Sequence, residues 1–128
     1  MRNMVRVAFA VFVAVALFAA GYVTAQNKFG QPTTIIHVVT IKWKAGVAEE
    51  EKQKAIEGVR KMAAEIPGIK NIWLKATRVQ PQDFNAAFVI EFENRAAADL
   101  YAEHPAHKAW AEHYLTIREA SRSQQVTN

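Results

Sequence analysis

The sequence predicts an α+β domain with the element order β-α-β-β-α and room for a further short strand at the C-terminus, the split βαβ plan. Two patterns lead to this prediction. Several segments rich in β-branched residues alternate between two faces, and the segments between them repeat apolar residues at the i, i+3 and i+4 spacing of a helix. We therefore expect an antiparallel sheet with its helices on one face.

The N-terminal segment differs in composition from the rest of the chain. Arg2 and Arg6 precede an unbroken apolar run over residues 7–20, and compact residues follow it up to Ala25. This layout is typical of a secretory signal peptide, and we expect cleavage after Ala25. The alternative is an uncleaved membrane anchor over residues 7–23, because a spanning helix prefers roughly 20 apolar residues and this run is only marginally long enough.

Residues 26–33 are polar and contain glycine and proline, so we expect a linker there and the folded domain over residues 34–128. Cleavage after Ala25 lowers the net charge from +4 to +2 and leaves 103 residues, enough for one hydrophobic core. Lysine and arginine are interleaved with acidic residues, which does not favour nucleic-acid binding. We expect a periplasmic or secreted protein, or one tethered to a membrane if the segment is retained.

The first strand is expected over residues 34–44. Its predicted core face carries Ile35, His37, Val39, Ile41 and Trp43. Residues 49–66 fit a helix because their apolar residues form one stripe, and the glutamates of the first turn suit the positive end of the helix dipole. Pro67 and Gly68 end this helix.

Two further strands are expected over residues 69–79 and 86–93, with a loop at residues 80–83 between them. The core face of the second of these strands carries Phe88, Ile90 and Phe92.

Two helices follow these strands. Asn94 can cap a short helix over residues 95–102, and Pro105 is well placed to begin another that runs to about Ala120. The tail, residues 121–128, is polar and leaves room for a short edge strand near Gln125 and Val126.

The sheet face away from the helices is half apolar. It is expected to carry Ile36, Val38, Trp73 and Val89 among lysine, threonine and glutamate side chains. An apolar patch of this kind usually marks an interface, and a two-fold dimer is the commonest symmetric arrangement that covers it. We favour a homodimer through the sheet face over an open sheet with scattered apolar residues.

The histidines are the candidates for chemistry. His37 lies in the middle of the first strand on its core face, and His104 and His107 lie at the start of the last helix, so they can converge. A histidine there can act as general acid or base, and Tyr101 can polarise a carbonyl. The structural alternatives are a core histidine, a helix cap and, for Tyr101 and Trp110, ordinary core packing.

Metal and cofactor sites are not expected. Histidine residues 104, 107 and 37 supply at most three ligands, without cysteine or a well-placed carboxylate. The sequence has no phosphate-binding loop, dinucleotide fingerprint or nucleophile elbow. The fourth histidine, His113, is expected on a solvated face beside Glu112.

Four segments together resemble the stress-responsive A/B barrel (Dabb) family over about Ile35 to Leu115. They are the strand IIHVVTIKWK, the helix end EIPGI, the strand FVIEFE and the segment YAEHPAHKAW. The resemblance implies a ferredoxin-like fold and a dimeric α+β barrel formed through the sheets. The family includes plant stress proteins and a plant polyketide cyclase that performs an aldol condensation without a cofactor. The C-terminal segment here is more polar than is usual in the family.

The resemblance also implies roles for individual residues. In the cyclase a tyrosine and the second histidine of HPAH form an acid–base pair, and these positions match Tyr101 and His107, while His37 matches the strand histidine. The candidate catalytic residues are therefore His107, Tyr101 and His37, and the candidate ligand-binding residues are His104, Trp110 and Phe88. We expect an exported homodimer that binds a small apolar molecule between sheet and helices; the alternative is a cofactor-free cyclase or lyase.

Overall fold

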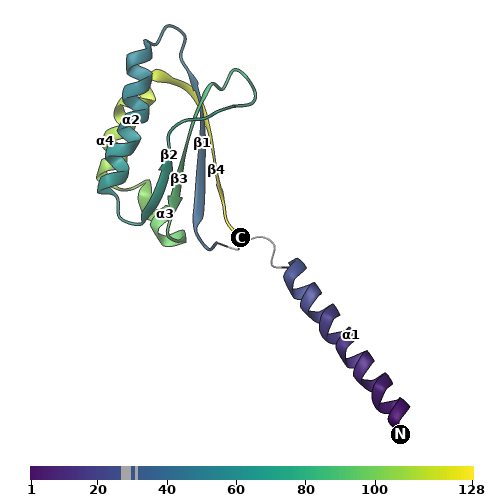
Figure 1. The fold of residues 1–128 in the computed structure, drawn as a ribbon. Helices are drawn as coiled ribbons and strands as arrows, with labels where there is room; N and C mark the ends of the chain where they lie inside the picture. Colours follow the sequence, from purple (N-terminus) through teal and green to yellow (C-terminus); the bar gives the residue numbers. More distant parts are fainter. Residues whose placement is uncertain (27–29, 31) are drawn as a thin grey trace. The chain divides into compact units, whose positions relative to one another are not determined.

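The computed structural model describes residues 1–26, 30 and 32–128, and the chain divides into two compact units, residues 1–31 and 32–128 (Figure 1). The first unit contains helix α1 (Arg2–Gln26). Its side chains up to residue 19 are exposed, and the stretch Arg2–Ala19 is long and apolar enough to cross a membrane. Half of the expected linker, residues 27–29 and 31, lies outside the described residues.

The second unit is built on a four-stranded antiparallel sheet. Its strands are β1 (Ile35–Trp43), β2 (Ile69–Trp73), β3 (Ala86–Phe92) and β4 (Arg118–Val126). The order across the sheet is β2-β3-β1-β4, with β1 at the centre between β3 and β4 (Figure 1). This confirms the predicted α+β split βαβ plan.

Three helices cover one face of this sheet: α2 (Glu49–Glu65), α3 (Arg95–Tyr101) and α4 (Pro105–Ile117) (Figure 1). Residues with known capping preferences fix where the last two begin. The Asn94 side chain accepts a hydrogen bond from the Ala97 backbone N–H at 2.9 Å, and Pro105 occupies the first turn of α4, where its missing N–H costs nothing.

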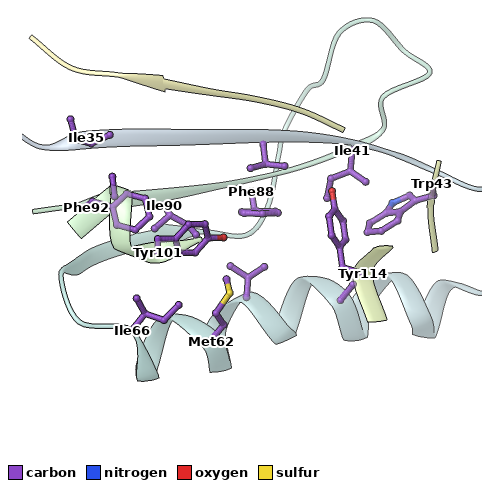
Figure 2. Packing of buried hydrophobic residues seen from close by; sticks show 14 residues of the cluster. Ile35, Ile41, Trp43, Met62, Ile66, Phe88, Ile90, Phe92, Tyr101 and Tyr114 are labelled. Carbon is purple, nitrogen blue, oxygen red and sulfur yellow. The ribbon is translucent and has the colours of Figure 1, made fainter. Parts of the chain in front are cut away.

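The hydrophobic core lies between the sheet and the helices (Figure 2). The predicted core positions of β1 and β3 are buried, except that His37 is only partly so. From α2, Val59 and Met62 reach the same layer, and Tyr101 and Tyr114 close it from α3 and α4. The alternation of apolar residues therefore predicted the inner face of the sheet correctly.

Two element boundaries differ from the prediction. The second strand ends at Trp73 rather than at Val79, because its ladder with β3 stops at the pair Trp73 and Val89. The last helix ends at Ile117 rather than at about Ala120, and the short edge strand expected near Gln125 and Val126 is the nine-residue strand β4, which begins at Arg118. Backbone hydrogen bonds to β1 stabilise β4 although β4 lacks an apolar pattern.

The ends of this unit lie side by side at the β1–β4 edge. The Thr127 hydroxyl donates to the backbone carbonyl of Thr34 at 2.9 Å, just after β4 and just before β1. The open face of the sheet carries the predicted apolar row, since Trp73 lies opposite Val89 and Val89 lies opposite Val38. Trp73 is 46% exposed on this face.

Candidate functional site

Five of the six predicted site residues form one cluster with Phe92 beneath the helices. We call it the histidine cluster, and its members are His37, Phe88, Phe92, Tyr101, His107 and Trp110. The ring centre of Tyr101 lies 5.8 Å from the ring centre of His37 and 4.4 Å from that of His107. The predicted convergence of the strand histidine with the start of the last helix is therefore present in the structure.

His37 is placed by β1, which turns its side chain toward the helices. Its ring packs against Phe92 and Tyr101, and its Nδ1 atom is buried with no hydrogen-bond partner among the described residues. Burial, followed by the nearby His107, lowers the pKa of His37. The neutral ring is therefore the favoured form near pH 7, because both influences oppose a positive charge.

His107 lies in the first turn of α4, and its environment selects one tautomer. Its Nδ1 is 3.1 Å from the carbonyl oxygen of Ala102, which can only accept, so Nδ1 carries the proton and Nε2 keeps its lone pair. Burial is the largest influence on the pKa of His107 and lowers it. The ring is consequently suited to accept a proton at Nε2.

Tyr101 ends α3 and is 5% exposed, between the two histidines. Burial raises the pKa of its phenol well above the ordinary value, with a smaller contribution from Tyr114. The hydroxyl therefore remains protonated at neutral pH and can donate a hydrogen bond. A neutral base and a protonated phenol side by side are an arrangement that can move a proton and stabilise a developing negative charge.

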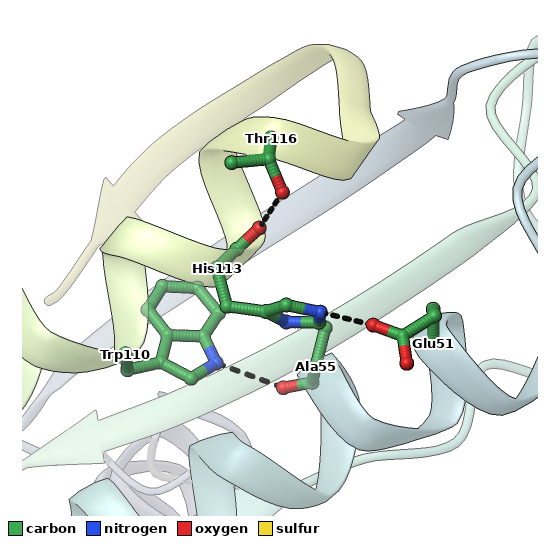
Figure 3. Close-up of polar contacts among 5 residues, drawn as sticks. All are labelled: Glu51, Ala55, Trp110, His113 and Thr116. Carbon is green, nitrogen blue, oxygen red and sulfur yellow. Dashed lines mark hydrogen bonds and ion pairs between the residues drawn. The ribbon is translucent and has the colours of Figure 1, made fainter.

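Trp110 and Phe88 form the other end of the cluster. Their rings meet edge to face at 5.7 Å, and Trp110 Nε1 donates to the Ala55 carbonyl of α2 at 2.8 Å (Figure 3). A Cβ atom on Gly58 would lie 2.7 Å from the Trp110 ring, so the absence of a side chain there admits the indole. Trp110 thus joins the cluster to the packing of α4 on α2.

The sixth predicted residue, His104, lies outside the histidine cluster. Its side chain caps α4 by accepting a hydrogen bond from the Ala106 N–H at 3.1 Å, the alternative considered from the sequence. It lines a cavity of about 430 Å³ together with Ile66, Pro67, Gly68, Ala97, Leu100 and Glu103. This cavity lies between the end of α2 and α3.

His113 was expected on a solvated face beside Glu112, and this expectation is wrong. The ring is half-buried, and its Nε2 lies 2.5 Å from the Glu51 carboxylate across the contact between α4 and α2 (Figure 3). The hydrogen bond to His113 is the main cause of a lowered pKa at Glu51. The sequence gave no sign that His113 and Glu51 pair, since the two residues are 62 positions apart.

A second cavity, of about 440 Å³, opens between α2 and the ends of β2 and β3. Its floor includes Trp43, Ile56 and Leu74, and lysine, glutamate and amide side chains surround them. None of the predicted site residues lines this cavity. In the part of the chain that the structure describes, no group of three histidine, aspartate or glutamate side chains is placed to hold a metal ion.

The sheet order, the helices on one face and the buried cluster define a ferredoxin-like α+β domain. The model of the stress responsive A/B barrel domain (Dabb) family matches residues 35–126, nearly the whole second unit. The chain therefore belongs to this family.

Solved structures with the same fold are similar to this chain. A Dabb family protein from Mesorhizobium loti is 22% identical, with a TM-score of 0.64 over 74% of this chain and 96% of that one. A dimeric ferredoxin-like protein of unknown function from Bacteroides fragilis is 22% identical, with a TM-score of 0.63 over 77% and 100%. Hydroxynitrile lyase from Passiflora edulis is 16% identical, with a TM-score of 0.66 over 76% and 94%. No curated protein matches the sequence.

Proposed function

We propose that this protein is an exported homodimer that binds a small, mostly apolar molecule at the histidine cluster. One observation carries the proposal: His37, Tyr101 and His107 come from three separate elements and meet in an aromatic layer between sheet and helices. His37 Nδ1 is buried there without a partner among the described residues, and buried polar atoms normally have one. An apolar molecule with one hydroxyl or carbonyl group matches the chemistry of these side chains.

Binding at the cluster can be tested with 1-octanol, an apolar molecule with one hydroxyl group. The full chain is titrated with 1-octanol while the imidazole NMR signals of the histidines are followed. We expect the signals of His37 and His107 to shift saturably. His113, whose ring is held by Glu51 of α2, serves as the internal control and should move much less. Unchanged signals from His37 and His107 in the folded protein would show that the binding proposal is wrong.

The dimer is supported by two independent observations. The open face of the sheet carries Val38, Val89 and Trp73 in one row, and similar structures are described as dimeric. Sheet-to-sheet packing of two copies would remove this row from water, which is favourable in proportion to the apolar area buried. Sedimentation velocity of the isolated protein measures the oligomeric state directly, and a monomer at micromolar concentration would contradict the proposal.

Export is supported by α1, whose apolar stretch follows Arg2 and Arg6. Expression of the full chain, cell fractionation and mass measurement test this proposal. A periplasmic or secreted product that begins after Ala25 is expected. An intact chain in the membrane fraction would support the tethered alternative, and an intact cytoplasmic chain would contradict both.

A second candidate function is cofactor-free acid–base catalysis of lyase or cyclase type. The specific observation in its favour is the tautomer of His107, whose free Nε2 belongs to the ring that packs on the protonated Tyr101 phenol. In the cleavage of a cyanohydrin, His107 would take the hydroxyl proton while the C–CN bond breaks and the carbonyl forms. The proton would then pass to the departing cyanide, and Tyr101 would hydrogen-bond the substrate oxygen.

Release of benzaldehyde from mandelonitrile tests this candidate, because one of the similar structures is a hydroxynitrile lyase. His107→Asn and Tyr101→Phe should each lower the rate by about 10²-fold or more if they act as general base and donor. The rate should fall as the pH drops below the lowered pKa of His107, because the protonated ring cannot accept a proton. A rate equal to the uncatalysed one in the unmodified protein would contradict catalysis of this reaction.

A further inference from the structure

The edge strand β4 presents a row of polar side chains on the same side of the sheet as the helices. Ser121, Ser123 and Gln125 lie directly opposite the core-facing residues Ile41, Val39 and His37 of β1. Residues that face each other across an antiparallel ladder project to the same side. We call Ser121, Ser123 and Gln125 the polar ledge. Ser123 and Gln125 are exposed, so the helices leave this part of the ledge open to solvent.

An arginine stands at each end of the polar ledge. Arg118 Nη1 donates to the Ser121 hydroxyl at 2.9 Å, and Arg95 Nη1 donates to Gln125 Oε1 at 3.0 Å. Within the described ranges, neither guanidinium forms an ion pair with a carboxylate. The four-residue separation from Ser121 to Gln125 corresponds to roughly 13 Å along a strand, too far for one carboxylate to serve both arginines.

Unpaired polar atoms mark both ends of the ledge. Arg118 Nε and His37 Nδ1 are buried and have no hydrogen-bond partner among the residues that the structure describes. The Arg118 guanidinium is held over the Tyr114 ring, 5.7 Å from its centre, so its position is set by packing. A buried cationic N–H normally has an acceptor, and a carboxylate matches the fork of an arginine in geometry and charge.

We propose that the polar ledge binds a linear dicarboxylate with an apolar middle, one carboxylate on Arg118 and the other on Arg95. The chain between them would cross Ser123 and pass His37, the member of the histidine cluster nearest the ledge in register. This proposal rests on the proposed function, since the histidine cluster would contact the apolar middle of the molecule while the two arginines hold its charged ends. It also gives a role to the polar character of β4, which the apolar cluster does not explain.

The experiment compares three eight-carbon probes, suberate, octanoate and 1,8-octanediol, by calorimetric titration of the full chain. Suberate should bind most tightly and the diol most weakly. Arg95→Gln and Arg118→Gln should each weaken suberate binding roughly tenfold, the value of one charged hydrogen-bonding partner, and bring it to the level of octanoate. Arg60→Gln is the matched control, because Arg60 pairs with Glu57 on α2 and should leave all three affinities unchanged.

Arg118 also packs on Tyr114, so Arg118→Lys provides a variant that keeps the charge but loses the fork. It should retain part of the preference for suberate over octanoate. Equal binding of suberate and the diol, or a preference that survives both glutamine variants, would overturn the dicarboxylate assignment. If 1-octanol still shifts the His37 and His107 signals in that case, the apolar site stands without the ledge. If no probe binds, both proposals fail.

Discussion

Trp110 shows how much of the domain can depend on one side chain. Its indole stacks on Tyr114 at 4.5 Å, meets Phe88 edge to face and donates a hydrogen bond to α2. Gly58 is the counterpart of this arrangement, because a methyl group at that position would overlap the indole. Glycine in the middle of α2 therefore lets the Trp110 ring approach the helix closely, although glycine has a low helix propensity.

We predict that Gly58→Ala destabilises the domain. Helix propensity alone would favour alanine by roughly 1 kcal/mol, but overlap with Trp110 should cost about 1–3 kcal/mol. In a Trp110→Leu background the overlap is relieved, and the same substitution should become stabilising. Urea unfolding of the four proteins of this double-mutant cycle measures the coupling. An equal effect of Gly58→Ala in both backgrounds would show that the indole is not the cause.

At the same scale, the sequence predicted His37, Tyr101 and His107 as a group because strand alternation and the start of a helix place them on converging faces. It did not predict the pairing of His113 with Glu51. That contact depends on how α2 and α4 cross, which is fixed by Trp110 and Gly58 and not by any local pattern.

At the scale of elements, two glycines connect strands and helices in backbone conformations that L-residues rarely adopt. Gly46 has φ 79° in the turn before α2, and Gly68 has φ 84° in the turn after it. Their surroundings differ. A Cβ atom at Gly46 would meet nothing within 4 Å, whereas one at Gly68 would lie 2.5 Å from the Ala97 Cβ. The turn after α2 is therefore also a packing point against α3.

This difference gives a matched pair of substitutions. Gly46→Ala should cost about 1 kcal/mol of unfolding free energy, the penalty for an alanine at positive φ. Gly68→Ala should cost that penalty plus about 1–3 kcal/mol for the overlap with Ala97. Chemical denaturation of both variants measures the gap. Equal losses would mean that α3 moves away from the turn without cost.

The contact between α2 and α4 should weaken in acid. The lowered pKa of Glu51 means that its ionised form is favoured in the folded state. The corresponding stability is fully present above the ordinary pKa of 4.5 and is lost as the pH falls through the lowered value. Glu51→Gln should therefore show a smaller fall in melting temperature between neutral and acid pH than the unmodified protein. Glu50→Gln, at the exposed neighbouring position, is the control and should not flatten the curve.

Strand β4 shows where prediction of elements reached its limit. Strands β1 and β3 alternate apolar and polar residues and were predicted almost to their ends. The segment Arg118–Val126 carries serine, glutamine and arginine instead, and only its pairing with the central strand β1 makes it a strand. Tertiary hydrogen bonding overrode a sequence that lacks the usual signal.

For the whole molecule, the open sheet face is the feature with the clearest consequence. Trp73→Lys places a charge in the apolar row, and because Trp73 is 46% exposed the fold itself should tolerate the change. We expect the variant to sediment as a monomer. Leu100→Lys, at a residue of α3 that is 70% exposed, is the control and should remain dimeric. A dimeric Trp73→Lys protein would place the interface elsewhere.

The fold as a whole was predictable because each core face follows from local alternation, and the motif around His104 and His107 pointed to the family. The cavity floored by Trp43, Ile56 and Leu74 was not predictable. Those residues come from three distant segments, and each reads in the sequence as ordinary core. The polar ledge was not predictable either, because only the register of β4 on β1 shows that its side chains project to the same side of the sheet as the helices.

The hydrogen bond from Thr127 to Thr34 has a consequence for chain connectivity. It places the two ends of the folded domain next to each other, so a short peptide could join them and new ends could be opened at the exposed loop over residues 80–83. Such a circular permutant would keep every strand pairing and every contact of the histidine cluster. We therefore expect the permutant to form the same architecture with its segments synthesised in a different order.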